Sequence, residues 1–249
     1  MKIVLLFRDS VEAKYLSNIL NKNIKIDVLI LENGKISNIR KVKRIFGKAN
    51  FLQYPLKILD LASITLYSKY FDYKLSKDIN KEGYNKFPKD IPTYKVDDAN
   101  GNDCVSLLKS TYPDIILVLG TSILKEEVLS IPKEFLLNIH GGIVPEYRNV
   151  HSDFWAFLNK DYDNIGVSII YLDKGIDSGD TALKSFIEIM PGDGLCEIKK
   201  KNLRLAANLI LEAIDKANQG TLERIKQDDS KKRFYKTPGF FDIIKIIKR

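Results

Sequence analysis

Residues 114–122 read DIILVLGTS, an apolar run that ends in a turn-forming glycine. A short apolar run bounded by turn signals is typical of a strand buried on both faces of a parallel sheet. Similar runs lie at 2–7, 25–31, 92–96, 135–139 and 166–172. Amphipathic stretches at 10–21, 103–110 and 202–218 have the spacing of helices that alternate with these strands. The alternation predicts an α/β fold, with a mostly parallel, Rossmann-like sheet flanked by helices.

Further helices are expected within 34–88 and at 125–130 and 151–159. The segment 120–124 then forms a loop at the carboxyl end of the strand at 114–119. Open α/β sheets bind ligands at this edge, so we expect the chemistry of the protein to cluster there.

The composition excludes several classes of protein. The longest apolar runs are far shorter than the roughly 20 residues of a membrane-spanning helix, and Arg8 and Asp9 interrupt the apolar start before it could serve as a signal peptide. Cys104 and Cys196 show neither disulfide nor zinc spacing. We therefore expect a cytoplasmic protein with reduced thiols and no membrane partner.

The formal net charge of +8 suits a nucleic acid, an anionic surface or a phosphorylated small substrate. The basic residues are dispersed over 40–48, 199–201 and 231–233, and no RNA-binding aromatic signature accompanies them. The pattern favours a generally basic solvated surface, and we expect no nucleic-acid partner.

Asn138 and His140 form the first candidate constellation. They stand two residues apart in a predicted strand, so both side chains point to the same face. In acyl transfer an amide could stabilise the developing oxyanion while an imidazole handles the proton of the attacking amine. The alternative is a structural histidine beside a turn-forming asparagine.

Residues 173–180 read DKGIDSGD and form the second constellation. Two glycines allow tight backbone geometry, and turn chemistry accounts for most of the pattern. A calcium loop would need a twelve-residue ligand pattern with a closing Glu, which is missing, so we expect no metal site.

Taken together, the two stretches resemble the folate-dependent formyltransferase family. The matching positions are NIHGG at 138–142, Pro145, Tyr147-Arg148, Trp155-Ala156, GVSI at 166–169 and the DxGIDSGD pattern at 173–180. The resemblance implies a formyltransferase fold in which Asn138 is an oxyanion donor, His140 handles a proton, and Asp177 orients His140 and a water molecule. Asn149 replaces a glycine that the family often has there, and Asn tolerates positive φ.

The resemblance also implies 10-formyltetrahydrofolate as the formyl donor. Its pterin would contact the loop after the strand at 114–119, although an ordinary turn is the alternative reading of that loop. The implied folate contacts are Leu119, Gly120, Thr121, Ser122, Ile123 and Asp173. A catalytic domain over 1–185 and a C-terminal helix and tail over 186–249 are expected. Because the end of the tail is apolar, we expect a homodimer in which residues after 185 take part.

Enzymes of the family that this chain resembles fall into three branches, which differ in the acceptor of the formyl group. Methionyl-tRNA formyltransferases carry a large extra C-terminal domain, whereas about seventy residues follow Asp180 here. Phosphoribosylglycinamide formyltransferases have a glycine-rich loop after the first strand, and residues 8–12 contain no glycine. The chain is most similar to the sugar N-formyltransferase branch, which implies a nucleotide-linked amino sugar, with dTDP-4-amino-4,6-dideoxyglucose as the best guess, used for lipopolysaccharide O-antigen synthesis.

Arg8, Tyr147 and Arg148 are the expected acceptor contacts, since guanidinium groups bind phosphates well. Two other readings stay open: a folate-binding regulatory protein without activity, and a hydrolase that releases formate.

Overall fold

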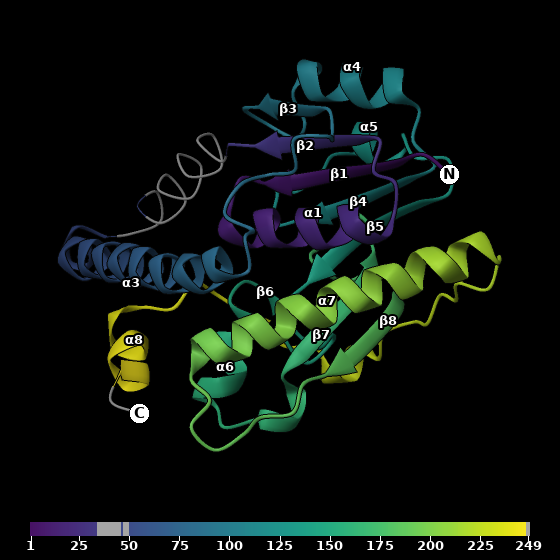
Figure 1. The fold of residues 1–249 in the computed structure, drawn as a ribbon. Helices are drawn as coiled ribbons and strands as arrows, with labels where there is room; N and C mark the ends of the chain where they lie inside the picture. Colours follow the sequence, from purple (N-terminus) through teal and green to yellow (C-terminus); the bar gives the residue numbers. More distant parts are fainter. Residues whose placement is uncertain (34–45, 47–49, 248–249) are drawn as a thin grey trace.

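A seven-stranded sheet forms the centre of the computed structural model, which describes residues 1–33, 46 and 50–247 (Figure 1). Its strand order is β3-β2-β1-β4-β5-β7-β8. The strands are β1 (Ile3–Arg8), β2 (Val28–Glu32), β3 (Thr93–Val96), β4 (Ile115–Leu119), β5 (Phe135–His140), β7 (Gly166–Tyr171) and β8 (Thr181–Phe186). The pairs from β3 to β5 are parallel, and β7 and β8 are antiparallel. The predicted α/β fold with a mostly parallel sheet is confirmed.

Helices cover both faces of the sheet (Figure 1). Alternate residues of β1 explain this arrangement: Leu5 and Phe7 pack in a core with α1 (Val11–Asn23) and α7 (Leu195–Asn218). Val4 and Leu6 pack on the opposite side with α4 (Asn102–Thr111) and α5 (Glu126–Leu129). Because both faces of each central strand are apolar, the strands read as continuous hydrophobic runs in the sequence.

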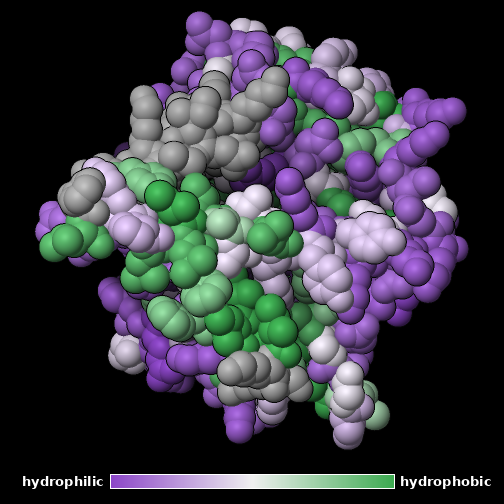
Figure 2. Space-filling model, turned by 90° about the vertical axis from the view of Figure 1, so that its left-hand side faces the viewer, coloured by the Kyte–Doolittle hydropathy of each residue, from purple (hydrophilic) through white to green (hydrophobic). Residues whose placement is uncertain are grey.

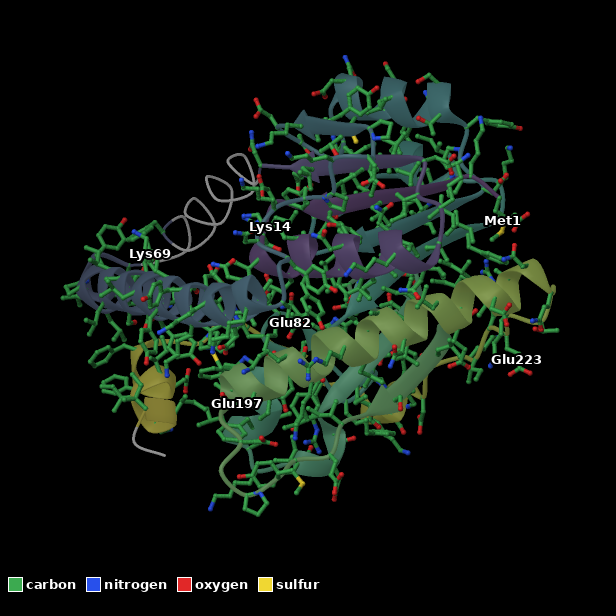
Figure 3. The ribbon with its side chains drawn as sticks, viewed as in Figure 1. Met1, Lys14, Lys69, Glu82, Glu197 and Glu223 are labelled. Atoms are coloured by element: carbon green, nitrogen blue, oxygen red, sulfur yellow. The ribbon has the colours of Figure 1, made fainter. Side chains whose placement is uncertain are left out.

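The longest helix is α3 (Tyr54–Lys81), preceded by the 3₁₀ turn η1 (Phe51–Gln53). Figure 3 shows Glu82, just after this helix, beside α7, where its Oε1 lies 2.9 Å from Arg204 Nη2. The helices expected within 34–88 include this one, and the parts of that prediction at 34–45 and 47–49 lie outside the described residues.

Helix α7 is an integral part of the main core. Its residues Leu203, Ile210 and Ala213 pack with the β1 and β4 side chains of the same cluster. The predicted division at residue 185 therefore separates two stretches of sequence that share one core, and the domain boundary itself stays a prediction.

The chain after α7 returns across the molecule. Ile225 bridges to Thr181, and the short strand β9 (Phe234–Tyr235) pairs with β6 (Arg148–Asn149). The last helix, α8 (Phe240–Ile247), then packs against α3 and α6 (Ser152–Leu158). The return brings residues 225–235 next to the segment that follows β5. Two further 3₁₀ turns are η2 (Tyr162–Asn164) and η3 (Asp229–Lys231).

No helix among the described residues has the length and apolar character needed to cross a membrane.

Candidate active site

The carboxyl ends of β4 and β5 form the candidate site. Val118 of β4 pairs with Asn138 of β5, so the loop that follows β4 begins beside Asn138. Leu137 and Ile139 pack in the core with α1 and α7, which turns Asn138 and His140 toward the opposite face of the strand.

The three predicted catalytic side chains lie together. Asn138 Nδ2 donates a hydrogen bond to Asp177 Oδ1 over 3.2 Å, and His140 Nδ1 lies 3.6 Å from Asp177 Oδ2. The backbone N–H of Asn149 also donates to Oδ2, over 2.8 Å. Asp177 has φ of +49°, a left-handed conformation that Asp and Asn tolerate better than most residues. Its carboxylate therefore stands between the amide and the imidazole.

The far side of the His140 ring determines its tautomer. Nε2 lies 2.7 Å from the carbonyl oxygen of Tyr147, and a carbonyl can only accept, so Nε2 carries the hydrogen. The buried Ser152 hydroxyl donates to the same carbonyl over 3.0 Å. In the neutral ring Nδ1 then has a lone pair and faces Asp177. Nδ1 is therefore the nitrogen that can take up a proton in the site.

The turn after β5 holds this arrangement in place. A Cβ atom at Gly142 would lie 2.3 Å from Ser152 Cβ and 3.0 Å from His140 Nε2, so only glycine fits. Asn149 adopts φ of +80°, which agrees with the expectation that Asn could replace a glycine there. Its side-chain amide donates to the carbonyl of Tyr235 over 2.7 Å, which fastens the turn to the returning chain.

The loop predicted to bind folate is held by a buried carboxylate. Glu32, at the end of β2, is 1% exposed and accepts hydrogen bonds from Ser122 N over 2.8 Å and from Ser122 Oγ over 2.7 Å. It also accepts one from Ala99 N over 3.0 Å. Gly120 has φ of +65°, which favours glycine and leaves the main chain uncovered by a side chain. The loop is thus fixed at the sheet edge, with Gly120 and Ile123 exposed.

Asp173 holds its own loop. Its Oδ1 accepts from Gly175 N over 2.9 Å and from Ser178 Oγ over 2.8 Å. These bonds shape the turn that carries Asp177, so the structure gives Asp173 a role in positioning that turn in addition to the predicted contact with folate.

Tyr147 and Arg148 have partners inside the chain, in contrast to the exposed positions that substrate contact would need. The Tyr147 hydroxyl donates to Asp161 over 2.8 Å, its ring stacks on Tyr235, and burial raises its pKa. Arg148 is 2% exposed, and its guanidinium donates to Gln227 Oε1 and Asp229 Oδ1, both over 2.8 Å. The guanidinium expected to face a phosphate instead crosslinks the turn to the returning chain.

Arg8, the other predicted phosphate contact, lies at the sheet edge. It ends β1 in register with Glu32, and its Cβ would lie 3.8 Å from a Cβ built on Gly120. This position borders the loop at 119–123.

Gln227 is a site residue that the sequence analysis missed. Its Nε2 donates to the main-chain carbonyls of Asp177 over 3.0 Å and of Gly179 over 2.6 Å, while its Oε1 accepts from Arg148. Gln227 thus connects the Asp177 loop to Arg148. It stands fifty positions after Asp177 in the sequence, within no motif, so no sequence signal pointed to it.

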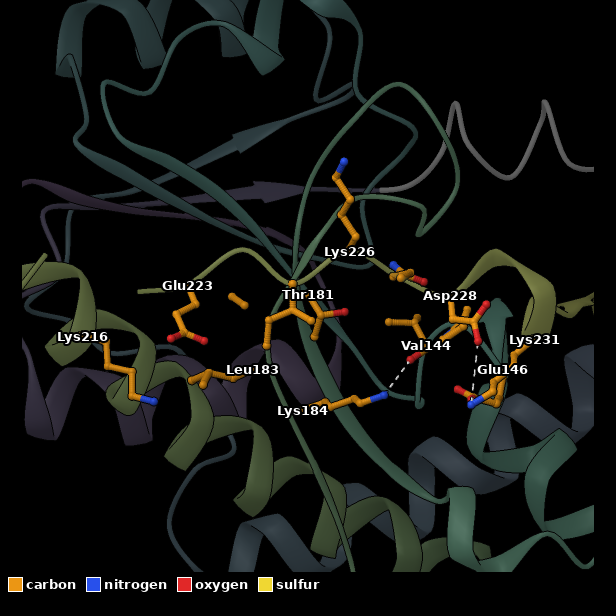
Figure 4. Close-up of a pocket in the computed structure, with 14 residues that line it drawn as sticks. Val144, Glu146, Thr181, Leu183, Lys184, Lys216, Glu223, Lys226, Asp228 and Lys231 are labelled. Carbon is orange, nitrogen blue, oxygen red and sulfur yellow. Dashed lines mark hydrogen bonds and ion pairs between the residues drawn. The ribbon is translucent and has the colours of Figure 1, made fainter. Parts of the chain in front are cut away.

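A cavity of about 400 Å³ lies between β8 and the returning chain (Figure 4). Lysines 184, 216, 226 and 231 contribute to its wall, together with Gln227. Asn138, His140 and Asp177 do not line it. Within the described part of the chain, no group of three or more His, Cys, Asp or Glu side chains could hold a metal ion.

The family model for formyl transferases matches residues 70–214, which include Asn138, His140 and Asp177. The chain therefore belongs to the formyl transferase family.

Individual relatives agree with the family. A methionyl-tRNA formyltransferase from Geobacter metallireducens is 30% identical over 141 residues, which are 56% of this chain and 45% of that protein. The chain thus spans less than half the length of this relative.

Solved structures with the same fold include a 4-N formyltransferase from Francisella tularensis, with a TM-score of 0.58, 14% identity, and coverage of 94% of this chain and 76% of that one. An N-formyltransferase from Helicobacter canadensis, in complex with folinic acid and dTDP-3-aminofucose, has a TM-score of 0.55 and 17% identity over 94% of this chain and 70% of its own. At these identities the likeness shows the fold alone.

Proposed function

We propose that this chain is an N-formyltransferase that moves the formyl group of 10-formyltetrahydrofolate to the amine of a nucleotide-linked amino sugar. The observation that carries the proposal is the placement of Asn138, His140 and Asp177 around one point at the sheet edge, in a chain of the formyl transferase family.

The geometry suits attack of an amine on a formyl carbon. The amine nitrogen bonds to that carbon, and negative charge develops on the formyl oxygen. The Asn138 amide has two N–H groups, of which one is bonded to Asp177, and the second can donate to the oxyanion. Nδ1 of His140 takes a proton from the attacking amine, and the Asp177 carboxylate stabilises the imidazolium that forms. N10 of the folate leaves as its bond to the formyl carbon breaks, and it receives the proton that His140 took from the amine.

Folate as the co-substrate is supported by the loop at 119–123, which Glu32 holds at the end of β4 next to Asn138. The pterin would contact main-chain groups of Leu119, Gly120 and Thr121, because Ser122 N is already bonded to Glu32. The structural neighbour from Helicobacter canadensis is described with folinic acid bound, which supports a folate derivative here.

An amino-sugar nucleotide as the acceptor is supported by two neighbours, one described as a 4-N formyltransferase and the other as a complex with dTDP-3-aminofucose. We propose dTDP-4-amino-4,6-dideoxyglucose as the first substrate to try, and a role in surface polysaccharide synthesis. Arg8 is the candidate contact for a phosphate, because it borders the loop at 119–123. The described cysteines are free, in keeping with a cytoplasmic enzyme.

Methionyl-tRNA is the second candidate acceptor, because the relative from Geobacter metallireducens is named as a methionyl-tRNA formyltransferase. A panel of acceptors separates the two candidates. The purified chain is incubated with 10-formyltetrahydrofolate and, in separate reactions, with 3-amino and 4-amino deoxysugar nucleotides, glycinamide ribotide or charged initiator tRNA, and formylated product is measured by mass spectrometry. We expect product from one or more sugar nucleotides. Product from tRNA or glycinamide ribotide alone would overturn the proposed acceptor, and no product from any acceptor would favour a folate-binding regulatory protein.

A further inference from the structure

The loop that carries Asp177 starts at the surface and ends at the site. Residues 173–176 are exposed, whereas the side chain of Asp177 is 11% exposed and faces His140. Asp177 also has φ of +49°, a conformation that residues other than glycine keep only where surrounding contacts hold it. The contacts to the main chain of this loop therefore determine where its carboxylate lies.

The side-chain amide of Gln227 supplies such contacts. Its Nε2 donates to the carbonyl oxygens of Asp177 over 3.0 Å and of Gly179 over 2.6 Å. Its Oε1 accepts from Arg148 Nε over 3.1 Å and from Arg148 Nη2 over 2.8 Å. A primary amide has two N–H groups and two lone pairs on its oxygen, so every one of them is used. The flipped amide would face its oxygen to two carbonyls and its NH₂ to a guanidinium, so the chemistry allows one orientation only.

The segment that carries Gln227 is anchored on both sides. Ile225 exchanges two backbone hydrogen bonds with Thr181 at the start of β8, over 2.8 and 3.0 Å. Arg233 accepts a backbone hydrogen bond from Arg148 over 3.0 Å, where β9 approaches β6. Gln227 thus stands between one fixed point on the sheet and another on the turn after β5. A side chain supported in this way can hold a second element in place.

The far end of the loop is fixed separately by β7. A Cβ atom at Gly179 would lie 1.8 Å from the carbonyl oxygen of Tyr171, so the two main chains are in close contact. The N–H of Tyr171 donates to the carbonyl of Asp180 over 2.9 Å. These contacts begin two residues after Asp177. Loss of the Gln227 amide would therefore release Asp177 while the end of the loop stays on β7.

We propose that Gln227 is a positioning residue, which keeps the Asp177 carboxylate against His140 by holding the main chain of the loop. This role rests on the proposed function, in which Asp177 stabilises the imidazolium that forms during transfer. A displacement of about 1 Å at a catalytic group can slow a reaction by about 10²-fold. Two hydrogen bonds from a residue fifty positions away in the sequence thus bear on the rate.

Gln227→Glu tests the role kinetically. The variant keeps an oxygen for Arg148, but its second oxygen can only accept and repels the two carbonyls. We expect kcat to fall at least about 10-fold, with KM for both substrates within about twofold of wild type. Gln219→Glu, the same change at an exposed position that ends α7, is the matched control and should keep kcat. An unchanged kcat in Gln227→Glu would overturn the proposal.

A double variant separates positioning from a general loss of structure. Because Gln227 acts through Asp177, adding Gln227→Glu to Asp177→Asn should lower kcat by less than about twofold further. Two independent effects would multiply instead, and the full product of the single losses would overturn the proposal. Thermal unfolding checks that each variant is folded.

Nitrogen-15 NMR of labelled histidine gives a readout that needs no turnover. The chain has two histidines, so the signals lost in His140→Asn assign those of His140. We expect the Nδ1 resonance of His140 to move in Gln227→Glu toward its position in Asp177→Asn, and to stay in place in Gln219→Glu. Gln227→Met, which adds no charge, should move it in the same direction.

The two readouts distinguish failure of this proposal from failure of the proposed function. A Nδ1 resonance that neither Gln227 variant moves, or that only Gln227→Glu moves, would overturn the positioning role, whether or not any acceptor is formylated. A resonance that both variants move, in a protein that formylates no acceptor, would support the positioning role and overturn the proposed function.

Discussion

The site edge and the outer face of α3 differ in how their side chains are satisfied. At the site edge His140, Asp177, Arg148 and Gln227 all have polar partners from the same chain. On α3 a row of large apolar side chains faces solvent. The family model begins at residue 70, so the first half of α3 also lies outside the matched region. The contrast shows that polar side chains at the site edge have their partners within one chain, whereas the exposed face of α3 leaves large apolar side chains in solvent (Figure 2).

The largest expected effect comes from removing the charge at the centre of the site. Asp177→Asn keeps the shape of the side chain and tolerates the positive φ, but it cannot stabilise an imidazolium. We expect kcat to fall by about 10³-fold. Steady-state kinetics measure the loss, and an unchanged unfolding temperature shows that the loop is intact. Turnover within a few-fold of wild type would mean that the carboxylate is structural.

His140→Asn should lower kcat by at least about 10²-fold, because the group that accepts the proton of the amine is lost. His151→Asn is the matched control: His151 has φ of +57°, which Asn tolerates, and it is the other histidine of the chain. We expect the control to keep most of its activity. Equal losses in both variants would show that the effect reaches the site through the turn rather than through proton transfer.

Arg148→Ala tests whether Arg148 stabilises the fold, as its hydrogen bonds to Gln227 and Asp229 indicate, rather than binding a substrate. The change removes two donors to Gln227 Oε1, the Nε and Nη2 nitrogens of Arg148. We therefore expect the free energy of unfolding to fall by about 2 kcal/mol. KM for both substrates should change by similar factors. The exposed neighbour Arg233→Ala is the control for lost positive charge. A rise in KM for the sugar nucleotide alone, with unchanged stability, would restore Arg148 as a phosphate contact.

The smallest expected effect concerns Glu32, which holds the loop at 119–123. In Glu32→Gln an amide N–H₂ replaces one of the oxygens that face the donors of Ala99 and Ser122. We expect KM for 10-formyltetrahydrofolate to rise about tenfold, with little change in kcat. Glu126→Gln, on the surface of α5, is the control. A larger effect on the sugar nucleotide than on folate would move the folate site away from this loop.

Local patterns in the sequence predicted most of the sheet and the placement of Asn138 and His140. Period-two alternation fixes which side chains share a face of a strand, so two residues of β5 could be assigned to one site before the fold was known. Asp177 was assigned through the family resemblance, because β7 separates it from His140 in the sequence and no local pattern connects the two residues.

Long-range contacts account for what the sequence did not predict. Arg148 was expected to contact the acceptor because guanidinium groups bind phosphates well, whereas its burial depends on the returning chain that carries Gln227. The alternating apolar and polar residues of β8 were not recognised as an edge strand. Apolar side chains lie on both the buried and the exposed side of α3, so its sequence periodicity does not indicate which side of the helix packs on the core.

The most direct test of the account follows the formyl group itself. Wild-type protein is supplied with 10-formyltetrahydrofolate labelled in the formyl carbon and with dTDP-4-amino-4,6-dideoxyglucose, and the label is traced in the sugar nucleotide and in formate. The account predicts that the label moves to the sugar amine in wild type, and that the His140→Asn protein transfers it at least about 10²-fold more slowly. Label that appears in formate at the same rate with and without the sugar nucleotide would contradict the account and identify a hydrolase.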